Sequence, residues 1–212
     1  MPDTPKKGDG IQYDVGVDDL LIVFKTTKET STTEPVYDPT VYRLPNIKKI
    51  GVKGNGKAAE IYGSSKLFAK VVQETQHELS LTHIGMPINI YDKMTGNDIK
   101  KGVAFSSTAA HEFPEFAVGI IANRSDGVKD VVWYPNCSLD AATTSDYETA
   151  EEAFKEQDGS LTITANGLRN SGIIYSNFNS AREIVDGLTY ETFIAQPVFS
   201  EAQLDTLTAP KA

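Results

Sequence analysis

The strongest hydrophobic pattern in the chain is a pair of apolar runs on either side of a polar turn. The runs cover residues 116–122 and 128–134, and the turn between them, residues 123–127, ends in Asp-Gly. Asp-Gly readily adopts the positive φ angles that a tight β-hairpin needs. The pattern therefore predicts a hairpin at the centre of the fold.

The first strand of this hairpin carries no face suited to water. Alternate side chains point to opposite faces of a strand, which places Phe116, Val118, Ile120 and Ala122 on one face. The other face carries the small or apolar residues Ala117, Gly119 and Ile121, followed by Asn123. Such a face is typical of a strand that packs against a helix or a neighbouring subunit. The alternative is a strand covered on both sides within one domain.

Apolar alternation predicts further short strands along the chain. A half-buried strand runs from Ile11 to Val17, and residues 20–24 continue it or pair beside it. Residues 67–74 and 78–84 are expected to form a hairpin, with Leu67, Ala69 and Val71 on one face of its first strand. The remaining expected strands are 41–44, 47–52, 160–168, 173–175 and 189–195.

Capping signals predict three short helical segments. Pro87 suits a first helical turn and Gly96 a stop, which indicates a helix between residues 85 and 96. Ser145 with Glu148 matches a capping box and favours a helix over residues 145–157. Ser180, Glu183 and Gly187 bracket about two helical turns.

Two polar stretches interrupt the strands. Residues 25–40 are Thr-rich with Pro35 and Pro39, and residues 53–66 are rich in glycine and serine. Loops this long in a compact domain are usually disordered or binding arms. We expect a mainly β (α+β) fold, a β-sandwich or barrel of two packed antiparallel sheets with one flanking short helix and long polar loops. Its domain covers residues 11–196, between a flexible arm (1–10) and a C-terminal tail (197–212).

Composition narrows the class of protein. The 212 residues suffice for one substantial core. The formal net charge of -9 argues against a surface that grips nucleic acid, and suits a solvated protein or a conduit through which polyanions pass. A single cysteine, no signal-like N-terminus and no run of about 20 apolar residues predict folding in a reducing cytoplasm, without a membrane.

The sequence holds few candidates for chemistry. Residues 51–58 nearly match a phosphate-binding P-loop, but Ala58 stands where the magnesium-binding Ser or Thr is needed and no helix is expected to follow. His77, His83 and His111 lack a metal-ligand spacing and are interpreted as surface or edge histidines. Cys137 is interpreted as a small buried hydrophobic residue. We therefore expect no enzyme activity, no cofactor and no metal.

The order of these features resembles that of the major tail proteins, or tail-tube proteins, of long-tailed, non-contractile phages of Gram-positive bacteria. The resemblance covers about residues 47–168. It rests on a Gly-rich loop, LFAKV from Leu67, SLTHIGMPINIYDKMTG, FPEFAVGIIANRSDGVKDVVWYPNCSL, and TAEE from Thr149 ahead of SLTITANGL. In that family the Thr-x-Glu-Glu stretch connects strands, which counts against a helix at 145–157.

The resemblance implies a structural virion protein without catalytic residues. Its copies would form hexameric rings stacked into a tail tube, around a tape-measure protein and later the passing double-stranded DNA, in a virion assembled in the host cytoplasm. Residues 25–40 and 170–212 have no place in the resemblance.

Two hypotheses from different classes follow. The first is a self-assembling tube subunit, in which loops of about 12 to 16 residues extend some 35 Å to reach a neighbour. The second is a monomeric β-sandwich binding module that presents its loops to a carbohydrate or protein. For the first hypothesis, the expected subunit contacts are Thr30, Thr33, Tyr37, Asn55, Lys57, Glu60, Tyr62, Ala117, Gly119 and Ile121.

Overall fold

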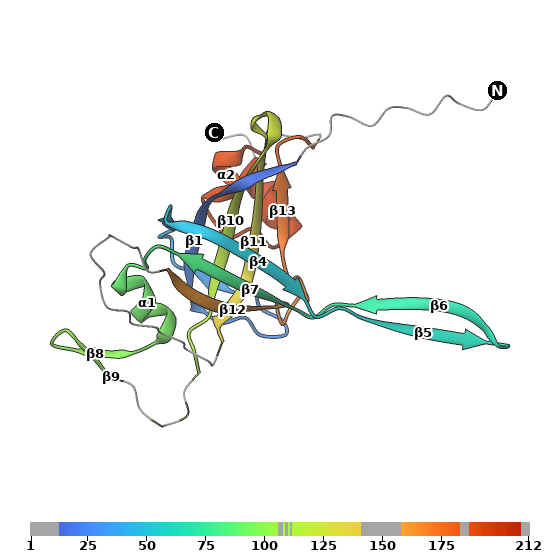
Figure 1. The fold of residues 1–212 in the computed structure, drawn as a ribbon, viewed down its shortest axis with the longest axis horizontal. Helices are drawn as coiled ribbons and strands as arrows, with labels where there is room; N and C mark the ends of the chain where they lie inside the picture. Colours follow the sequence, from blue (N-terminus) through green and yellow to red (C-terminus); the bar gives the residue numbers. More distant parts are fainter. Residues whose placement is uncertain are drawn as a thin grey trace, which may run out of the picture.

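The computed structural model describes residues 13–105, 108, 110, 112–140, 158–182 and 187–208. Most of the described chain is β-strand, with a few short helices (Figure 1). The strands are β1 (Asp14–Thr27), β2 (Val36–Tyr37), β3 (Tyr42–Leu44), β4 (Ile47–Gly54), β5 (Lys57–Gly63), β6 (Lys66–Gln73), β7 (Gln76–His83), β8 (Asp98–Lys100), β9 (Val103–Phe105), β10 (Phe116–Arg124), β11 (Lys129–Leu139), β12 (Gly159–Asn166) and β13 (Ser176–Asn179). The α-helices are α1 (Ile88–Thr95), α2 (Tyr190–Ile194) and α3 (Glu201–Thr208).

One large antiparallel sheet forms the body. Its strand order is β2-β1-β10-β11-β12-β7-β4, and β13 and β3 add to β11 and β1. The predicted central hairpin is confirmed as β10 and β11, in which Asn123 pairs with Lys129. A short 3-10 turn over Ser125–Gly127 connects the two strands, and Gly127 supplies the positive φ of 73°.

Strand β11 bends the sheet because it pairs with two different neighbours along its length. Its first half pairs with β13 through residues 130–133, whereas its last residues, 137–139, pair with β12. As a result β12, β7 and β4 cross over β1, β10 and β11 (Figure 1). The sheet therefore encloses a core between two of its own parts.

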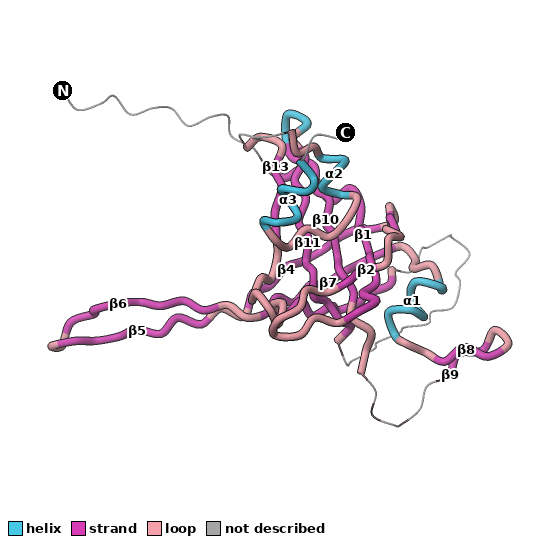
Figure 2. The backbone as a smooth tube through the Cα atoms, turned by 180° about the vertical axis from the view of Figure 1, so that it is seen from behind, coloured by secondary structure: helices cyan, strands magenta, loops and turns pink. Residues whose placement is uncertain are grey.

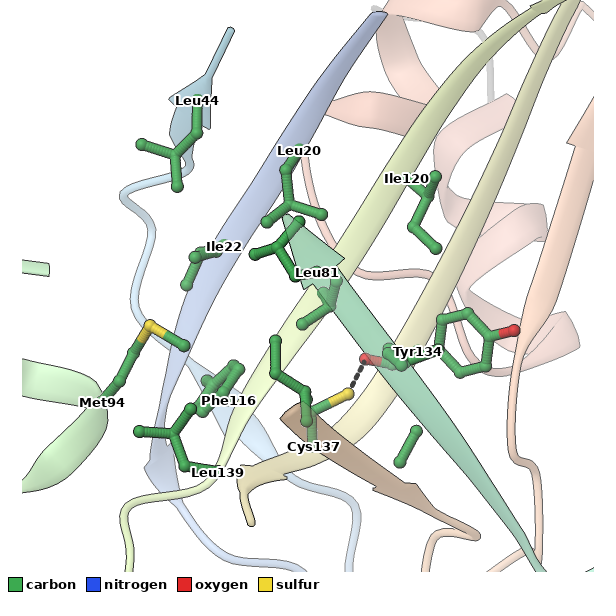
Figure 3. Packing of buried hydrophobic residues seen from close by; sticks show 14 of the residues in the cluster. Leu20, Ile22, Leu44, Leu81, Met94, Phe116, Ile120, Tyr134, Cys137 and Leu139 are labelled. Atoms are coloured by element: carbon green, nitrogen blue, oxygen red, sulfur yellow. Dashed lines mark hydrogen bonds between the residues drawn. The ribbon is translucent and has the colours of Figure 1, made fainter. Parts of the chain in front are cut away.

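The enclosed core is made by the predicted apolar alternation. Leu79 and Leu81 of β7 pack with Phe116, Val118 and other side chains from β1, β10, β11 and β12. Figure 3 shows Leu81 together with Phe116 in this core. Helix α1 closes one end with Met94 and Ile90, and its C-cap Gly96 has the left-handed φ of 68°. The predicted helix at residues 85–96 and the strands at 47–52, 78–84 and 160–168 are thus confirmed within one or a few residues at each end.

A second core covers the opposite face of β1, β10 and β11. Ala117 and Ile121 pack there with Trp133 and with Phe178 of β13, and the C-terminal residues Phe193 and Val198 close over them. Figure 2 shows α2 and α3 lying over this part of the sheet. The strand expected at 189–195 is therefore wrong. Thr189 instead caps a helix through its hydroxyl, which accepts the backbone N–H of Thr192.

This arrangement decides between the two interpretations of the small-residue face. Ala117, Gly119 and Ile121 are buried within a single chain. The β10 strand is covered on both sides in one domain, and these three residues are not open to a neighbouring subunit. Residues 197–208 are likewise no loose tail, because Val198 and Phe199 are buried and Leu204 and Leu207 pack on the second core.

The Thr-rich stretch at 25–40 is not a free arm either. Strand β1 continues to Thr27, and β2 folds back onto it, with Tyr37 opposite Lys25. The Lys25 ammonium is buried and donates to Glu29 at 2.7 Å, to Glu115 at 2.8 Å and to Asn136 at 2.8 Å. These charge-assisted bonds fix the loop to the body.

Several other expectations are corrected. Strand β6 pairs with β5, not with β7, so no hairpin joins 67–74 to 78–84. Residues 173–175 are not a strand, because the strand begins at Ser176. Tyr13 and Val15 are exposed, so the first strand is half-buried only from Val17 onward. Residues 1–12 and 141–157, and residues 183–186 of the helical segment expected at 180–187, lie outside the described residues; residues 180–182 form a turn and a bend.

Candidate functional site

The most distinctive feature of the molecule is a two-stranded ribbon made of β5 and β6 that projects from the body (Figure 1). The seven residues of β5, at about 3.3 Å each, give it a length of about 23 Å. The stretch predicted as a loop at 53–66 is thus strand on both sides of a turn at Ser64 and Ser65, which have positive φ of 50° and 61°. The ribbon continues the hairpin that β4 and β7 begin in the body sheet.

The ribbon exposes apolar side chains on both of its faces. A β-bulge between Ile61 and Tyr62 leaves Phe68 as the extra residue opposite them. Large apolar side chains are between 50 % (Ile61) and 82 % (Phe68) exposed, and they comprise Ile61, Tyr62, Leu67, Phe68, Val71 and Val72. An isolated two-stranded hairpin is marginally stable in water, and exposed apolar patches of this kind mark interaction sites.

Polar side chains organise one face of the ribbon. Glu60 lies opposite Lys70, with 3.8 Å between the carboxylate and the ammonium. The Tyr62 hydroxyl donates to the Glu60 carboxylate at 2.7 Å, which raises the pKa of Tyr62. These contacts are exposed, so they orient side chains and contribute little stability.

The base of the ribbon is held by a cluster around Asn55. The Asn55 carboxamide oxygen accepts the N–H groups of Thr75 and Gln76, at 3.0 and 3.2 Å, and its amide donates to the Thr75 hydroxyl at 2.9 Å. The Glu74 side chain lies against Gly54, where a Cβ would approach its Oε1 to 1.9 Å. Asn55 therefore connects the end of β4 to the start of β7 at the point where the ribbon leaves the body.

The ribbon and β4 carry charge opposite to that of the rest of the chain. Residues 47–73 contain six lysines and one glutamate, a net charge of +5, whereas the remaining residues contain 14 basic and 28 acidic side chains, a net charge of -14. All six lysines are exposed. This lysine spacing is visible in the sequence, but the sequence interpretation of the segment as a Gly-rich loop missed it.

The structure separates the predicted contact residues into three groups. Lys57, Glu60 and Tyr62 lie exposed on the ribbon, with Asn55 at its base. Thr30 and Thr33 are exposed in a turn of the 25–40 loop, where the Thr30 N–H donates to the Thr33 carbonyl. The third group, which consists of Tyr37, Ala117, Gly119 and Ile121, is partly or fully covered by the chain itself.

Tyr37 is a contact within the chain. Its hydroxyl donates to the Pro135 carbonyl at 2.6 Å, and its ring lies 5.8 Å from that of Phe199. Burial raises the pKa of Tyr37 well above its usual value. The residue therefore holds the 25–40 loop against the C-terminal segment.

The candidates for chemistry take up structural positions. His77 and His83 are buried, which corrects their interpretation as surface or edge residues; His111 lies outside the described residues. Burial lowers the pKa of His83. Cys137 is buried, as predicted, and its Sγ donates to the Tyr134 carbonyl at 3.5 Å (Figure 3). Burial raises the pKa of its thiol.

The near-match to a P-loop, residues 51–58, spans the end of β4 and the start of β5, with strand instead of helix after the glycines. Among the described residues, no group of three His, Cys, Asp or Glu side chains is placed to hold a metal ion. No helix in the described part of the chain has the length and apolar character needed to span a membrane.

No protein-family model matches the sequence, and no curated protein matches it significantly.

Proposed function

We propose that the chain is a structural, self-assembling protein whose copies associate through the β5–β6 ribbon into stacked hexameric rings. In this proposal it is the tail-tube protein of a long-tailed phage, found in the virion after assembly in the host cytoplasm. The rings enclose a tape-measure protein, contact other tail proteins, and later pass double-stranded DNA without binding it specifically.

The observation that carries the proposal is the projecting ribbon. Its six large apolar side chains are all at least half exposed, and β5 and β6 lie away from the body sheet (Figure 2). Burial of such side chains stabilises by about 25 cal/mol per Å² of apolar surface. A second copy of the chain offers that burial, and the free strand edges of the ribbon can add to it by backbone pairing.

The architecture supports the same proposal. An antiparallel sheet that bends over itself, with α1 at one end of the core, is compatible with the two-sheet sandwich or barrel and the flanking helix that the family resemblance implies. The acidic remainder of the chain, with net charge -14, suits a conduit that repels DNA.

A deletion of residues 57–73 tests the proposal. It joins Gly56 to Glu74 and keeps Asn55, Thr75 and Gln76, so that the β4–β7 hairpin closes with a short turn. We expect the wild-type chain to form rings or tubes in negative-stain micrographs. The deletion variant should unfold in urea at the wild-type midpoint and elute as a monomer.

The control is the double substitution Ile99→Ser and Phe105→Ser, which removes exposed apolar side chains from the β8–β9 hairpin and leaves the ribbon intact. It should assemble as the wild type does. Tubes of normal appearance from the deletion variant contradict the role of the ribbon. A wild-type chain that stays monomeric at high concentration supports the binding-module alternative.

A further inference from the structure

A shallow groove lies between the 34–41 loop and the segment that joins α2 to α3. Its volume is about 420 Å³, and its lining includes Glu34, Val36, Asp38, Pro39, Pro197 and Gln203. Figure 2 shows β2, which forms one wall, on the side of the body away from the ribbon. The ribbon of a chain therefore points away from the groove of the same chain.

The groove is preformed, because contacts within the chain hold both walls. Tyr37 bridges from one wall to Pro135, and its ring packs on Phe199 of the other wall. The Gln203 carboxamide oxygen accepts the N–H groups of Phe199 and Ser200, at 2.7 and 3.1 Å, and its amide donates to the Pro197 carbonyl at 3.2 Å. Both polar atoms of the Gln203 carboxamide are thus engaged in hydrogen bonds within the wall.

Two carboxylates line the groove. Glu34 is exposed, and Asp38 is half-buried, with its charge partly compensated by Lys93 of the same chain. The Asp38 carboxylate accepts the N–H of Thr40 at 2.8 Å, which holds the pKa of Asp38 below its usual value. The groove therefore combines apolar walls with two negative charges.

The tip of the ribbon has the complementary character. Phe68 is the most exposed large apolar side chain there, and Lys66 and Lys70 flank it in the sequence. An aromatic anchor in an apolar pocket with matched charges at the rim is the common form of a protein interface hot spot.

We propose that the groove receives the ribbon tip of a second copy of the chain, with Phe68 against its apolar walls and Lys66 facing Glu34 and Asp38. This inference rests on the proposed function, because it names the surface that the ribbon contacts. The contact joins different surfaces of the two copies, and such a head-to-tail contact builds closed rings or open filaments.

Charge reversal on each side tests the contact. The ribbon variant carries Lys66→Glu and Lys70→Glu. The groove variant carries Glu34→Lys and Asp38→Asn, because Asn retains an oxygen that accepts the Thr40 N–H. Each variant alone places like charges together, and we expect its sedimentable fraction to fall about tenfold or more below that of the wild type.

Recovery is the decisive measurement. An equimolar mixture of the two variants offers an acidic ribbon to a basic groove and a basic ribbon to an acidic groove, so alternating copies should assemble. The chain that carries all four substitutions should also assemble by itself. Urea unfolding of each variant establishes that it is folded. The matched charge control is Lys100→Glu with Lys101→Glu, at the end of β8 and in the turn that follows it.

Each other outcome has a definite meaning. Normal assembly of the groove variant, when deletion of the ribbon abolishes assembly, overturns the groove as the docking site and leaves the proposed function standing. If neither the mixture nor the variant with all four substitutions assembles, although all chains are folded, the groove is again not the docking site. If the wild type retains a short DNA duplex and the ribbon variant does not, while the variant still assembles normally, then the ribbon lysines contact nucleic acid and not the groove. A wild-type chain that never assembles contradicts the proposed function itself.

Discussion

Gly119 shows at the scale of one residue why a small side chain in a buried strand is ambiguous in the sequence. Its place on β10 lies under the Trp133 ring and beside Leu21, and an added Cβ would come within 2.9 Å of the Trp133 ring atom Cζ3. The small residue makes room for a large one of the same chain. A sequence shows the small residue but not the partner that requires it, so a helix, a neighbouring subunit and cover from within the same domain all remained open.

Gly119→Ala should therefore destabilise the fold. The added methyl group overpacks the second core, and we expect the free energy of unfolding to fall by about 1–3 kcal/mol. Urea denaturation measures it. Gly16→Ala is the control, because an added Cβ at Gly16 in β1 meets nothing within 4 Å. Equal stability of the two variants would contradict this packing.

The buried ion cluster around Lys25 predicts a dependence of stability on pH. Burial alone would raise the pKa of Glu29, but the hydrogen bonds it accepts, first from Lys25, together hold its pKa below the usual 4.5. A carboxylate with a lowered pKa in the folded state contributes stability above its usual pKa. That contribution is lost as the pH falls through the lowered value.

Glu29→Gln should remove this contribution. The variant should be less stable than the wild type at neutral pH, and its unfolding free energy should fall less steeply between about pH 6 and about pH 3. Urea midpoints across that range measure both effects. Glu191→Gln, at an exposed carboxylate of α2, is the control and should follow the wild-type curve. Parallel curves for wild type and Glu29→Gln would contradict the role of the buried pair.

At the scale of elements, apolar alternation predicted strands that bury one face, and it also predicted the exposed strand β6, but it missed β5. Leu79 and Leu81 of β7 and Ile163 of β12 mark strands in this way. In β5, a glycine before and a glycine with two serines after a short mixed segment are typical of a loop, and only its pairing with β6 reveals a strand.

The C-terminal segment was mispredicted for a different reason. Residues 189–195 are rich in threonine and aromatic side chains, which favour strands. The helix α2 forms because Thr189 and Thr192 satisfy each other's backbone N–H groups and Phe193 enters the second core. Tertiary packing thus overrides the local preference.

The candidate site was only half predictable. The sequence interpretation named Lys57, Glu60 and Tyr62 as contact residues, but it named neither the concentration of lysines on the ribbon nor the groove.

Proteolysis measures whether the ribbon is covered on assembly. Chymotrypsin cleaves after large apolar and aromatic side chains, and Tyr62, Leu67 and Phe68 are exposed in the monomer. We expect rapid cleavage between residues 62 and 68 in the monomer and strong protection in the assembled protein. Phe105 on the β8–β9 hairpin is the internal reference for an exposed site. Equal cleavage of the ribbon in both states would contradict its burial between copies.

At the scale of the whole molecule, the sequence suggested strands that complete their burial only among neighbouring copies, and the structure corrects this. The enclosed core and the second core are both closed by one chain, and the 25–40 loop is attached to the body. Among the described residues, the β5–β6 ribbon gathers six large apolar side chains that remain at least half exposed. The distinction between folding and association could not be made from the pattern of apolar residues, which is the same in either case.

The second core has a consequence for how a cell would supply the protein. Because α2 and α3 of the same chain close the second core over β1, β10 and β11, we expect each chain to fold without contacts to other copies. Its folding rate should then not depend on the protein concentration. Under the proposed function, folded monomers accumulate first, and the start of assembly then depends on a nucleus that orders the first few copies.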